Sequence, residues 1–183
     1  MSKTTKNDRQ KDPQQTDLGP IVSSSHLATG EMPALSEFEF GLILASHAFD
    51  RWIVRCMAAA GVTGVNAIDV LVLHSVNHRR RAKTLSDICV VLSIEDTHVA
   101  TYAIRKLEKA GLVLSGKADK EKTVSITKEG EAACERYRVI RERLLVKTAK
   151  TLGLSNDVAS ELAGELRALS GHYAQAARSA ASL

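Results

Sequence analysis

The chain has 183 residues, of which 44% are hydrophobic and 25% are charged, the proportions of an ordinary globular protein rather than a fibrous or disordered one. Its three cysteines are too few for a disulfide framework, and no apolar run approaches the roughly 18 residues of a membrane helix. The polar N-terminus lacks the apolar region of a signal peptide, so we expect a reduced, cytoplasmic protein without membrane association.

Positive charge is concentrated in one part of the chain. Residues 79–128 hold eleven basic and six acidic side chains, net +5, whereas the whole chain carries +4. A local basic segment is typical of a protein that binds a polyanion, although many such segments are only solvated surfaces. All three prolines lie within the first 33 residues, which leaves the rest of the chain free to form helices.

The first part of the chain divides into a tail and two helices. Residues 1–33 are polar and show no hydrophobic period, so we expect a disordered or loosely docked tail. The remainder, 34–183, is expected to be a single domain. A 3.6-residue hydrophobic period predicts one helix over 35–60, with Ser36 as its N-cap, and a second helix over about 65–78.

Two shorter helices and a hairpin follow. Each of the two helices opens on a Ser or Thr with an aspartate three residues later, which is the spacing of a capping-box variant. Thr84 opens the helix predicted over 84–92, and Ser93 opens the helix predicted over about 94–109. Two β-prone segments then predict a hairpin with a charged tip over 114–127.

The segment 84–128 therefore has the parts of a winged helix-turn-helix, whose second helix enters the major groove of DNA. The side chains predicted to reach base edges from that helix are Thr97, His98, Thr101, Tyr102 and Arg105, the last reaching either a base or a phosphate. The side chains predicted to contact phosphates or the minor groove are Lys117, Lys120 and Lys122 of the wing, and Arg79, Arg80, Arg81 and Lys83 before the first short helix.

Three parts of the sequence resemble the DNA-binding core of the MarR-family transcription regulators. They are LEKAGLV at 107–113, a charged hairpin containing Asp119, and SITKEG at 125–130. The order of predicted elements over about 35–180 is similar to that family as well. At the wing this chain has Asp-Lys-Glu-Lys at 119–122, where the family usually has Asp-Arg-Arg.

The resemblance implies a homodimer held by the terminal helices and a pocket for a small-molecule effector between these helices and the DNA-binding lobe. The sequence predicts two long helices near its C-terminus, over about 129–151 and 156–180, with Ser155 capping the second. It has too few large apolar residues to bury 35–60 and 129–180 within one subunit, which agrees with dimerisation. A twofold dimer would place its recognition helices roughly 34–36 Å apart and require a pseudo-palindromic site.

The cysteines and one histidine pair invite other interpretations. Cys56, Cys89 and Cys134 lack the spacing of a metal site, and we interpret them as buried small hydrophobes. A redox-sensing thiol is the alternative, with Cys56 or Cys134 as its site. His74 and His78 lie four residues apart, a spacing that can hold zinc, but no further ligand is suitably spaced, so we expect a partly exposed polar face and no metal.

The leading prediction is a mainly α-helical, dimeric, sequence-specific transcription regulator that binds double-stranded DNA and responds to an effector of unknown identity. No phosphate loop, nucleophile elbow or pair of catalytic carboxylates is visible, so we expect neither an enzyme nor a cofactor. The alternative is a winged-helix module that binds a protein instead of DNA. Glu95 and Asp96, which are acidic and close to the predicted recognition helix, slightly favour this alternative.

Overall fold

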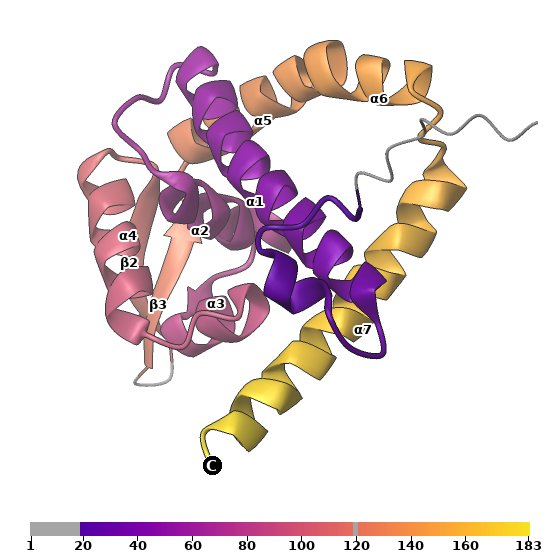
Figure 1. Ribbon diagram of the computed structural model, residues 1–183. Coiled ribbons are helices and arrows are strands. Elements are labelled where there is room, and N and C mark those ends of the chain that lie inside the picture. Colours follow the sequence, from indigo (N-terminus) through magenta and orange to yellow (C-terminus); the bar gives the residue numbers. More distant parts are fainter. Residues whose placement is uncertain (1–18, 119–120) are drawn as a thin grey trace, which may run out of the picture. The chain divides into compact units, whose positions relative to one another are not determined.

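The computed structural model describes residues 19–118 and 121–183 of the chain. These residues are mostly helical and include one small antiparallel sheet, which confirms the predicted fold class (Figure 1). The chain divides into two compact units, and the boundary between them falls inside the first long helix, between Phe49 and Asp50. In the part of the chain that the structure describes, no helix is long and apolar enough to cross a membrane.

Helix α1 spans Pro33–Ala59 and begins earlier than the sequence predicts. Proline suits the first position of a helix because its φ is already helical and its missing N–H would have no partner there. Ser36 is therefore not the N-cap, and that prediction is wrong. It lies inside the first turns of α1, buried, and its hydroxyl donates a hydrogen bond to the carbonyl oxygen of Leu27.

Helix α2, Ala67–Asn77, is slightly shorter than predicted and begins with a capping box. The side chain of Asn66 accepts the N–H of Asp69 at 2.9 Å, and the carboxylate of Asp69 accepts the N–H of Asn66 at 2.8 Å. Beyond the helix, Arg79 and Arg80 adopt left-handed backbone conformations, with φ of +58° and +49°. These two residues turn the chain sharply towards the next element.

Helix α3, Leu85–Leu92, opens on the predicted capping box between Thr84 and Asp87. It ends at Ser93, which is left-handed (φ +52°) and donates its N–H back to the helix at Cys89. Ser93 is therefore the residue that terminates α3, and the prediction that it caps the following helix is wrong.

Helix α4, Thr97–Lys109, is the second helix of the helix-turn-helix and begins later than the predicted residue 94. Its N-cap is Asp96, whose carboxylate accepts the N–H of His98 at 2.8 Å. One face of the helix is buried in the core, and Val99, which the sequence places on that face, is exposed. The buried side chains of α4 are Ala100, Ala103, Ile104 and Leu107.

The wing is a hairpin of β2, Val113–Ala118, and β3, Glu121–Ile126. A third strand, β1 at Lys83–Thr84, pairs with the other edge of β3, so the strand order is β1-β3-β2. The sequence does not predict β1, because two residues are too few to show an alternating pattern. Lys83 stands opposite Val124 in this ladder and is buried.

Helix α5, Lys128–Arg141, follows the wing and is capped by Thr127, whose hydroxyl accepts the N–H of Gly130 at 3.0 Å. It continues through a π-helical turn at Glu142–Val146 into α6, Lys147–Thr151. The predicted helix over 129–151 is thus right in extent, although the sequence did not indicate that its hydrogen bonding changes partway.

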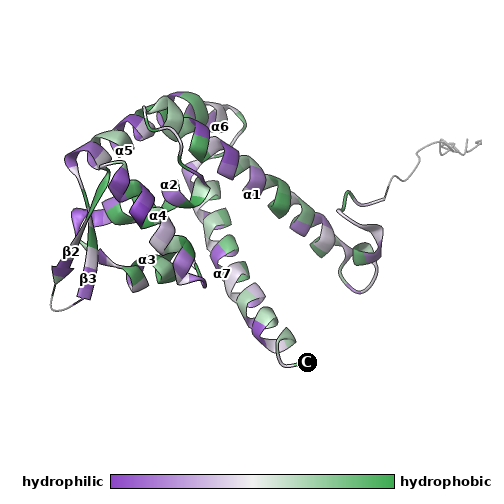
Figure 2. Ribbon diagram, turned by 90° about the vertical axis from the view of Figure 1, so that its left-hand side faces the viewer, coloured by the Kyte–Doolittle hydropathy of each residue, from purple (hydrophilic) through white to green (hydrophobic). Residues whose placement is uncertain are grey.

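Helix α7, Asn156–Ala180, begins at the predicted cap, Ser155, whose hydroxyl accepts the N–H of Val158 at 3.2 Å. None of the α7 residues is buried. Hydrophobic and hydrophilic residues alternate along it with the period of a helix (Figure 2).

The core of the second unit surrounds α2, which contacts α3, α4, α5 and β3. Its largest fully buried side chains come from the end of α1, from α2, α3 and α4, and from β2. They are Ile53, Met57, Val70, Val72, Leu73, Val76, Ile88, Leu107 and Val113. Burial of one such side chain stabilises the fold by about 1.5–3 kcal/mol, so this core holds α4 and the wing against α2.

Candidate nucleic-acid interface

Helix α4 directs the side chains predicted to read bases away from the core. Thr97, His98 and Arg105 are exposed, and Thr101 is half-buried. Tyr102 is 67% exposed, a large value for an aromatic side chain. Because the small and aliphatic residues of α4 hold the opposite face against the core, these five side chains share its outer surface.

A groove of about 570 Å³ separates α4 from the wing. Thr101 and Arg105 line it from the helix, and Lys117 and Lys122 line it from the two strands. The structure thus brings together four of the predicted DNA-contacting residues, although they are up to 21 positions apart in the sequence. Lys120, which is also predicted to contact DNA, lies outside the described residues.

Two of the three wing lysines stand directly opposite one another. Lys117 of β2 and Lys122 of β3 are partners in the antiparallel ladder. Like charges in this position oppose strand pairing, so their presence costs some stability. A surface that keeps two opposed ammonium groups in this way is suited to an anionic partner, which would neutralise both.

One hydrogen bond ties the end of α4 to the wing. The backbone N–H of Ser115 in β2 donates to Oε1 of Glu108 at 3.1 Å. Glu108 also lines the groove, so its carboxylate places a negative charge beside Arg105 and Lys117. The sequence analysis missed this contact, which depends on the register of the hairpin.

The N-terminal end of α4 borders a second, smaller cavity of about 340 Å³, lined by His98 and Tyr102 together with Asp69 and Asp96. The hydroxyl of Thr101 donates to the carbonyl oxygen of Thr97 at 2.8 Å, which leaves it free only to accept a hydrogen bond from a partner.

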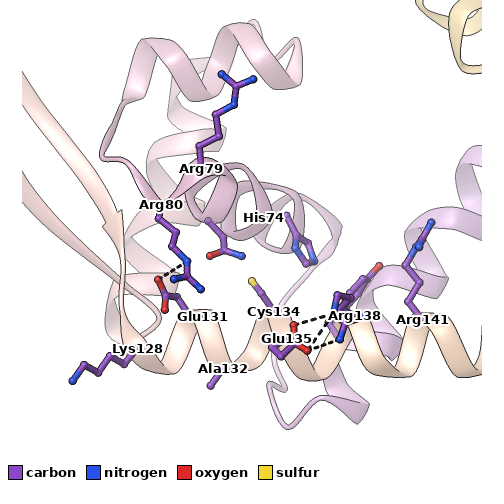
Figure 3. A pocket seen from close by; sticks show the side chains of 12 residues that line it. His74, Arg79, Arg80, Lys128, Glu131, Ala132, Cys134, Glu135, Arg138 and Arg141 are labelled. Carbon is purple, nitrogen blue, oxygen red and sulfur yellow. Dashed lines mark hydrogen bonds and ion pairs between the residues drawn. The ribbon is translucent and has the colours of Figure 1, made fainter. Parts of the chain in front are cut away.

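The basic residues before α3 do not join the groove. Arg79 and Arg80 line a different cavity, of about 1010 Å³, between α2 and α5 (Figure 3). Arg81 is exposed. Lys83, predicted to hold the DNA backbone, is buried, and its ammonium group donates to the carbonyl oxygens of His78 at 2.8 Å and Arg81 at 3.0 Å. That prediction for Lys83 is wrong, because the side chain stabilises the turn that leads into β1.

The cavity between α2 and α5 has a mixed but mainly cationic lining. Arg80 forms an ion pair with Glu131 at 3.5 Å, and Arg138 forms one with Glu135 at 2.6 Å, as drawn in Figure 3. The remaining charged side chains of the lining are all basic: Arg79, Lys128 and Arg141.

His74 lies in the wall of this cavity, half-buried, with its ring edge-on to Tyr137 at a centroid distance of 4.6 Å. Its Nε2 is buried and has no hydrogen-bond partner among the described residues, and burial lowers the pKa of this imidazole. His78 is exposed. Within residues 19–118 and 121–183, no group of three His, Cys, Asp or Glu side chains is placed to bind a metal.

All three cysteines are buried, which confirms that part of their interpretation. Burial, assisted by the nearby Glu131, raises the pKa of the Cys134 thiol to about 11, and burial also raises the pKa of Cys56. Oxidation begins from the thiolate, which is scarce at neutral pH when the pKa is this high. The burial of Cys134 and its raised pKa therefore do not favour a redox-sensing role for this thiol.

An ion pair that the sequence analysis missed connects α4 to α2. Nζ of Lys106 lies 2.6 Å from Oδ2 of Asp69. Two sequence features could have indicated it: Asp69 stands three residues after Asn66 at a helix start, and Lys106 lies between two positions of the apolar stripe of α4.

Comparison with known proteins shows which families have a similar sequence or fold. Residues 65–130 match the winged helix DNA-binding domain family. No curated protein sequence matches the chain significantly. Many solved structures do match, at low sequence identity, and this similarity shows the fold.

Three of these structures illustrate the similarity. A MarR family regulator from Neisseria meningitidis is 17% identical, with a TM-score of 0.62 over 78% of this chain and 95% of that one. MepR of S. aureus, in a complex with DNA, is 15% identical, with a TM-score of 0.59 over 74% and 96%. CouR of Rhodococcus jostii RHA1, bound to p-coumaroyl-CoA, is 15% identical, with a TM-score of 0.57 over 72% and 90%. The expected resemblance to the MarR family is therefore confirmed for the fold.

Proposed function

We propose that this chain, whose fold is that of the MarR family regulators, is a sequence-specific regulator that binds double-stranded DNA. Helix α4 would enter the major groove, which is about 12 Å wide and admits one helix. The wing would lie on the backbone or in the minor groove. The observation that supports this best is the single groove shared by the outer face of α4 and the wing lysines.

The residues predicted to contact DNA divide into two roles in this proposal. Thr101, Tyr102 and Arg105, with Thr97 and His98 at the start of the helix, would contact base edges. Lys117, Lys122 and Lys120 would contact phosphates, as would the exposed Arg81. Arg79 and Arg80, which line the cavity between α2 and α5, are better placed for a ligand than for DNA.

We further propose that the protein is a homodimer. Val158, Leu162 and Leu166 are spaced four residues apart on α7 and are each about half-exposed, for example 51% for Leu162. The first part of α1 also exposes Phe38, Leu42 and Phe49. Apolar side chains gathered along helices in this way are typical of protein interfaces. A twofold dimer would bring two α4 helices to successive turns of a pseudo-palindromic site.

DNA binding is tested with a duplex selected by this protein from a random pool, titrated in a gel shift at two salt concentrations. We expect two chains per duplex, and an affinity that falls with salt by a log–log slope of about −0.9 for each phosphate neutralised. Binding that is absent for every duplex, or insensitive to salt, would contradict the proposal. In that case a protein partner held on the outer face of α4 becomes the better explanation.

Replacing Arg105 by alanine is expected to weaken binding to the selected site by about 1–3 kcal/mol if its guanidinium reads a guanine. Binding to unrelated duplexes should change much less. The matched control is Lys109→Ala, which removes a charge from the same helix at an exposed residue that does not line the groove. Equal losses for the two variants, measured by the same gel shift, would show that Arg105 contributes only charge.

The cavity between α2 and α5 is the candidate site for an effector. Its surplus of basic side chains suits an anionic small molecule, and the similar CouR structure contains an acyl-CoA. A panel of organic carboxylates and acyl-CoA thioesters should include compounds that raise the melting temperature of the wild type but not of Arg80→Gln. If no anion raises it, this assignment is wrong.

A further inference from the structure

The ion pair between Lys106 and Asp69 is unusual for its burial. The side chain of Asp69 is 1% exposed and that of Lys106 is 32% exposed, and Nζ lies 2.6 Å from Oδ2. The same Oδ2 accepts the backbone N–H of Asn66 at 2.8 Å. One buried oxygen therefore joins the candidate recognition helix to the first turn of α2.

Apart from this pair, α4 is held by apolar contacts to the core and by the hydrogen bond that Glu108 accepts from Ser115 of the wing. Its buried side chains are Ala100, Ala103, Ile104 and Leu107, which are all apolar. Apolar contacts of this kind resist separation of two helices but allow small rotations and shifts. In the described part of the chain, the Lys106–Asp69 pair is the only ion pair that connects α4 to another element.

The position of Lys106 on α4 links the pair to the outer surface. Lys106 directly follows Arg105, and it lies one helical turn after Tyr102. Tyr102 and Asp69 line the same small cavity. A rotation of α4 that lengthened the ion pair would therefore also move Tyr102 and Arg105 relative to the wing.

Among the described residues, Lys106 is the one cation paired with Asp69. The other oxygen of Asp69, Oδ1, is buried and has no hydrogen-bond partner among the described residues. A buried carboxylate with one cation at hydrogen-bond distance favours the single geometry in which that cation is held. The ion pair thus stabilises one orientation of α4 over slightly rotated ones.

We propose that Asp69 and Lys106 are positioning residues that set the rotation of α4 and so determine which DNA sequences it prefers. This inference rests on the proposed DNA-binding function. Neither residue needs to contact DNA, because the effect passes through the orientation of Arg105 and Tyr102. Buried ion pairs contribute little net stability, and a role in fixing one arrangement is their best-supported use.

The test is the double variant Asp69→Asn/Lys106→Gln. Asparagine keeps a side-chain oxygen for the N–H of Asn66, and the two changes together leave the net charge unaltered. We expect affinity for the selected duplex to fall about tenfold, the loss caused by one misplaced base contact. Affinity for random duplexes, and its salt slope, should match the wild type. The charge-neutral control Lys150→Gln/Glu129→Gln, at two exposed positions outside α4 and the wing, should leave both affinities unchanged.

A single variant, Asp69→Asn, provides a second test in case the double variant folds poorly. Lys106 is partly exposed and can reach water without its partner. The variant carries one more positive charge, so electrostatics alone predicts tighter binding to every duplex. We expect instead that the ratio of specific to random affinity falls, while random affinity is unchanged or rises.

Three results would overturn the inference. A ratio equal to that of the wild type in both variants would show that the pair is only structural. A salt slope smaller by about one in the double variant would show that Lys106 contacts a phosphate. Failure of the wild type to bind any duplex would overturn the proposed function as well. The first two results would leave the proposed function standing, because in them the wild type still binds DNA.

Discussion

Alanine at Gly130 is expected to destabilise the protein by about 3 kcal/mol, near the upper end of the range for overpacking. Gly130 lies in the first turn of α5, where it approaches the base of the wing. A Cβ at this position would collide with the carbonyl oxygen of Leu112 and would lie 2.6 Å from Cδ1 of Ile126. The collision cannot be relieved by a side-chain rotation, because one of the two atoms belongs to the backbone.

Movement of that backbone would disrupt the start of α5. The carbonyl oxygen of Leu112 accepts a hydrogen bond from the N–H of Thr127 at 3.1 Å, and the Thr127 hydroxyl lies 2.8 Å from the carbonyl oxygen of Gly111 and 3.0 Å from that of Leu112. Thr127 in turn caps α5 by accepting the N–H of Gly130. Displacing Leu112 therefore weakens the cap and the closure of the wing together.

Urea denaturation of wild type and Gly130→Ala measures this effect. The control is Gly171→Ala in α7, where a Cβ would meet nothing within 4 Å. There the same substitution should stabilise the protein by about 0.5–1 kcal/mol, since glycine is unfavourable inside a helix. If Gly130→Ala were as stable as the wild type, the close approach of α5 to the wing would be wrong.

The second large loss of stability is expected from Lys106→Met. This variant leaves the carboxylate of Asp69 buried without a cation, which typically costs about 3–5 kcal/mol. We expect the lower end of that range, because Lys106 is 32% exposed and water can enter the space it leaves. Adding Asp69→Asn should restore most of the lost stability, since the uncompensated charge is then absent.

Urea denaturation of four proteins gives a double-mutant cycle. They are the wild type, Lys106→Met, Asp69→Asn and the variant that combines the two changes. Lys109→Met, at an exposed position of the same helix, should change stability by no more than about 0.5 kcal/mol. A loss for Lys106→Met as small as this control would mean that Asp69 is solvated in the folded protein.

Elements whose signals are local were predicted well from the sequence. The capping box of Thr84 with Asp87 and the cap at Ser155 both depend on residues within one helical turn. The same holds for the amphipathic face of α4, whose buried residues follow the helical period. These features need no information about the rest of the chain.

Elements that depend on distant contacts were missed or misplaced. Ser93 and Asp96 are spaced as a capping box, yet Ser93 ends one helix and Asp96 begins the next. The short strand β1 exists only because β3 offers it an edge. No sequence pattern indicates these outcomes, since the deciding partner lies far along the chain.

The candidate site shows the same division. The outward direction of Arg105 and Tyr102 follows from the period of one helix. The separation of Arg79 and Arg80 from the groove follows from two consecutive left-handed residues, a conformation that arginine rarely adopts and that its sequence context does not suggest. Arg79 and Arg80 therefore line the cavity between α2 and α5 and not the groove beside α4.

The order of the strands gives the wing lysines a further consequence. Strand β2 is an edge of the sheet, and its outer backbone groups have no strand beside them in the order β1-β3-β2. Exposed edges can recruit strands from other molecules and lead to aggregation, and lysine is a common protection against this. Lys117 lies on this edge. Its charge therefore helps to keep neighbouring molecules from joining sheet to sheet when the protein is concentrated.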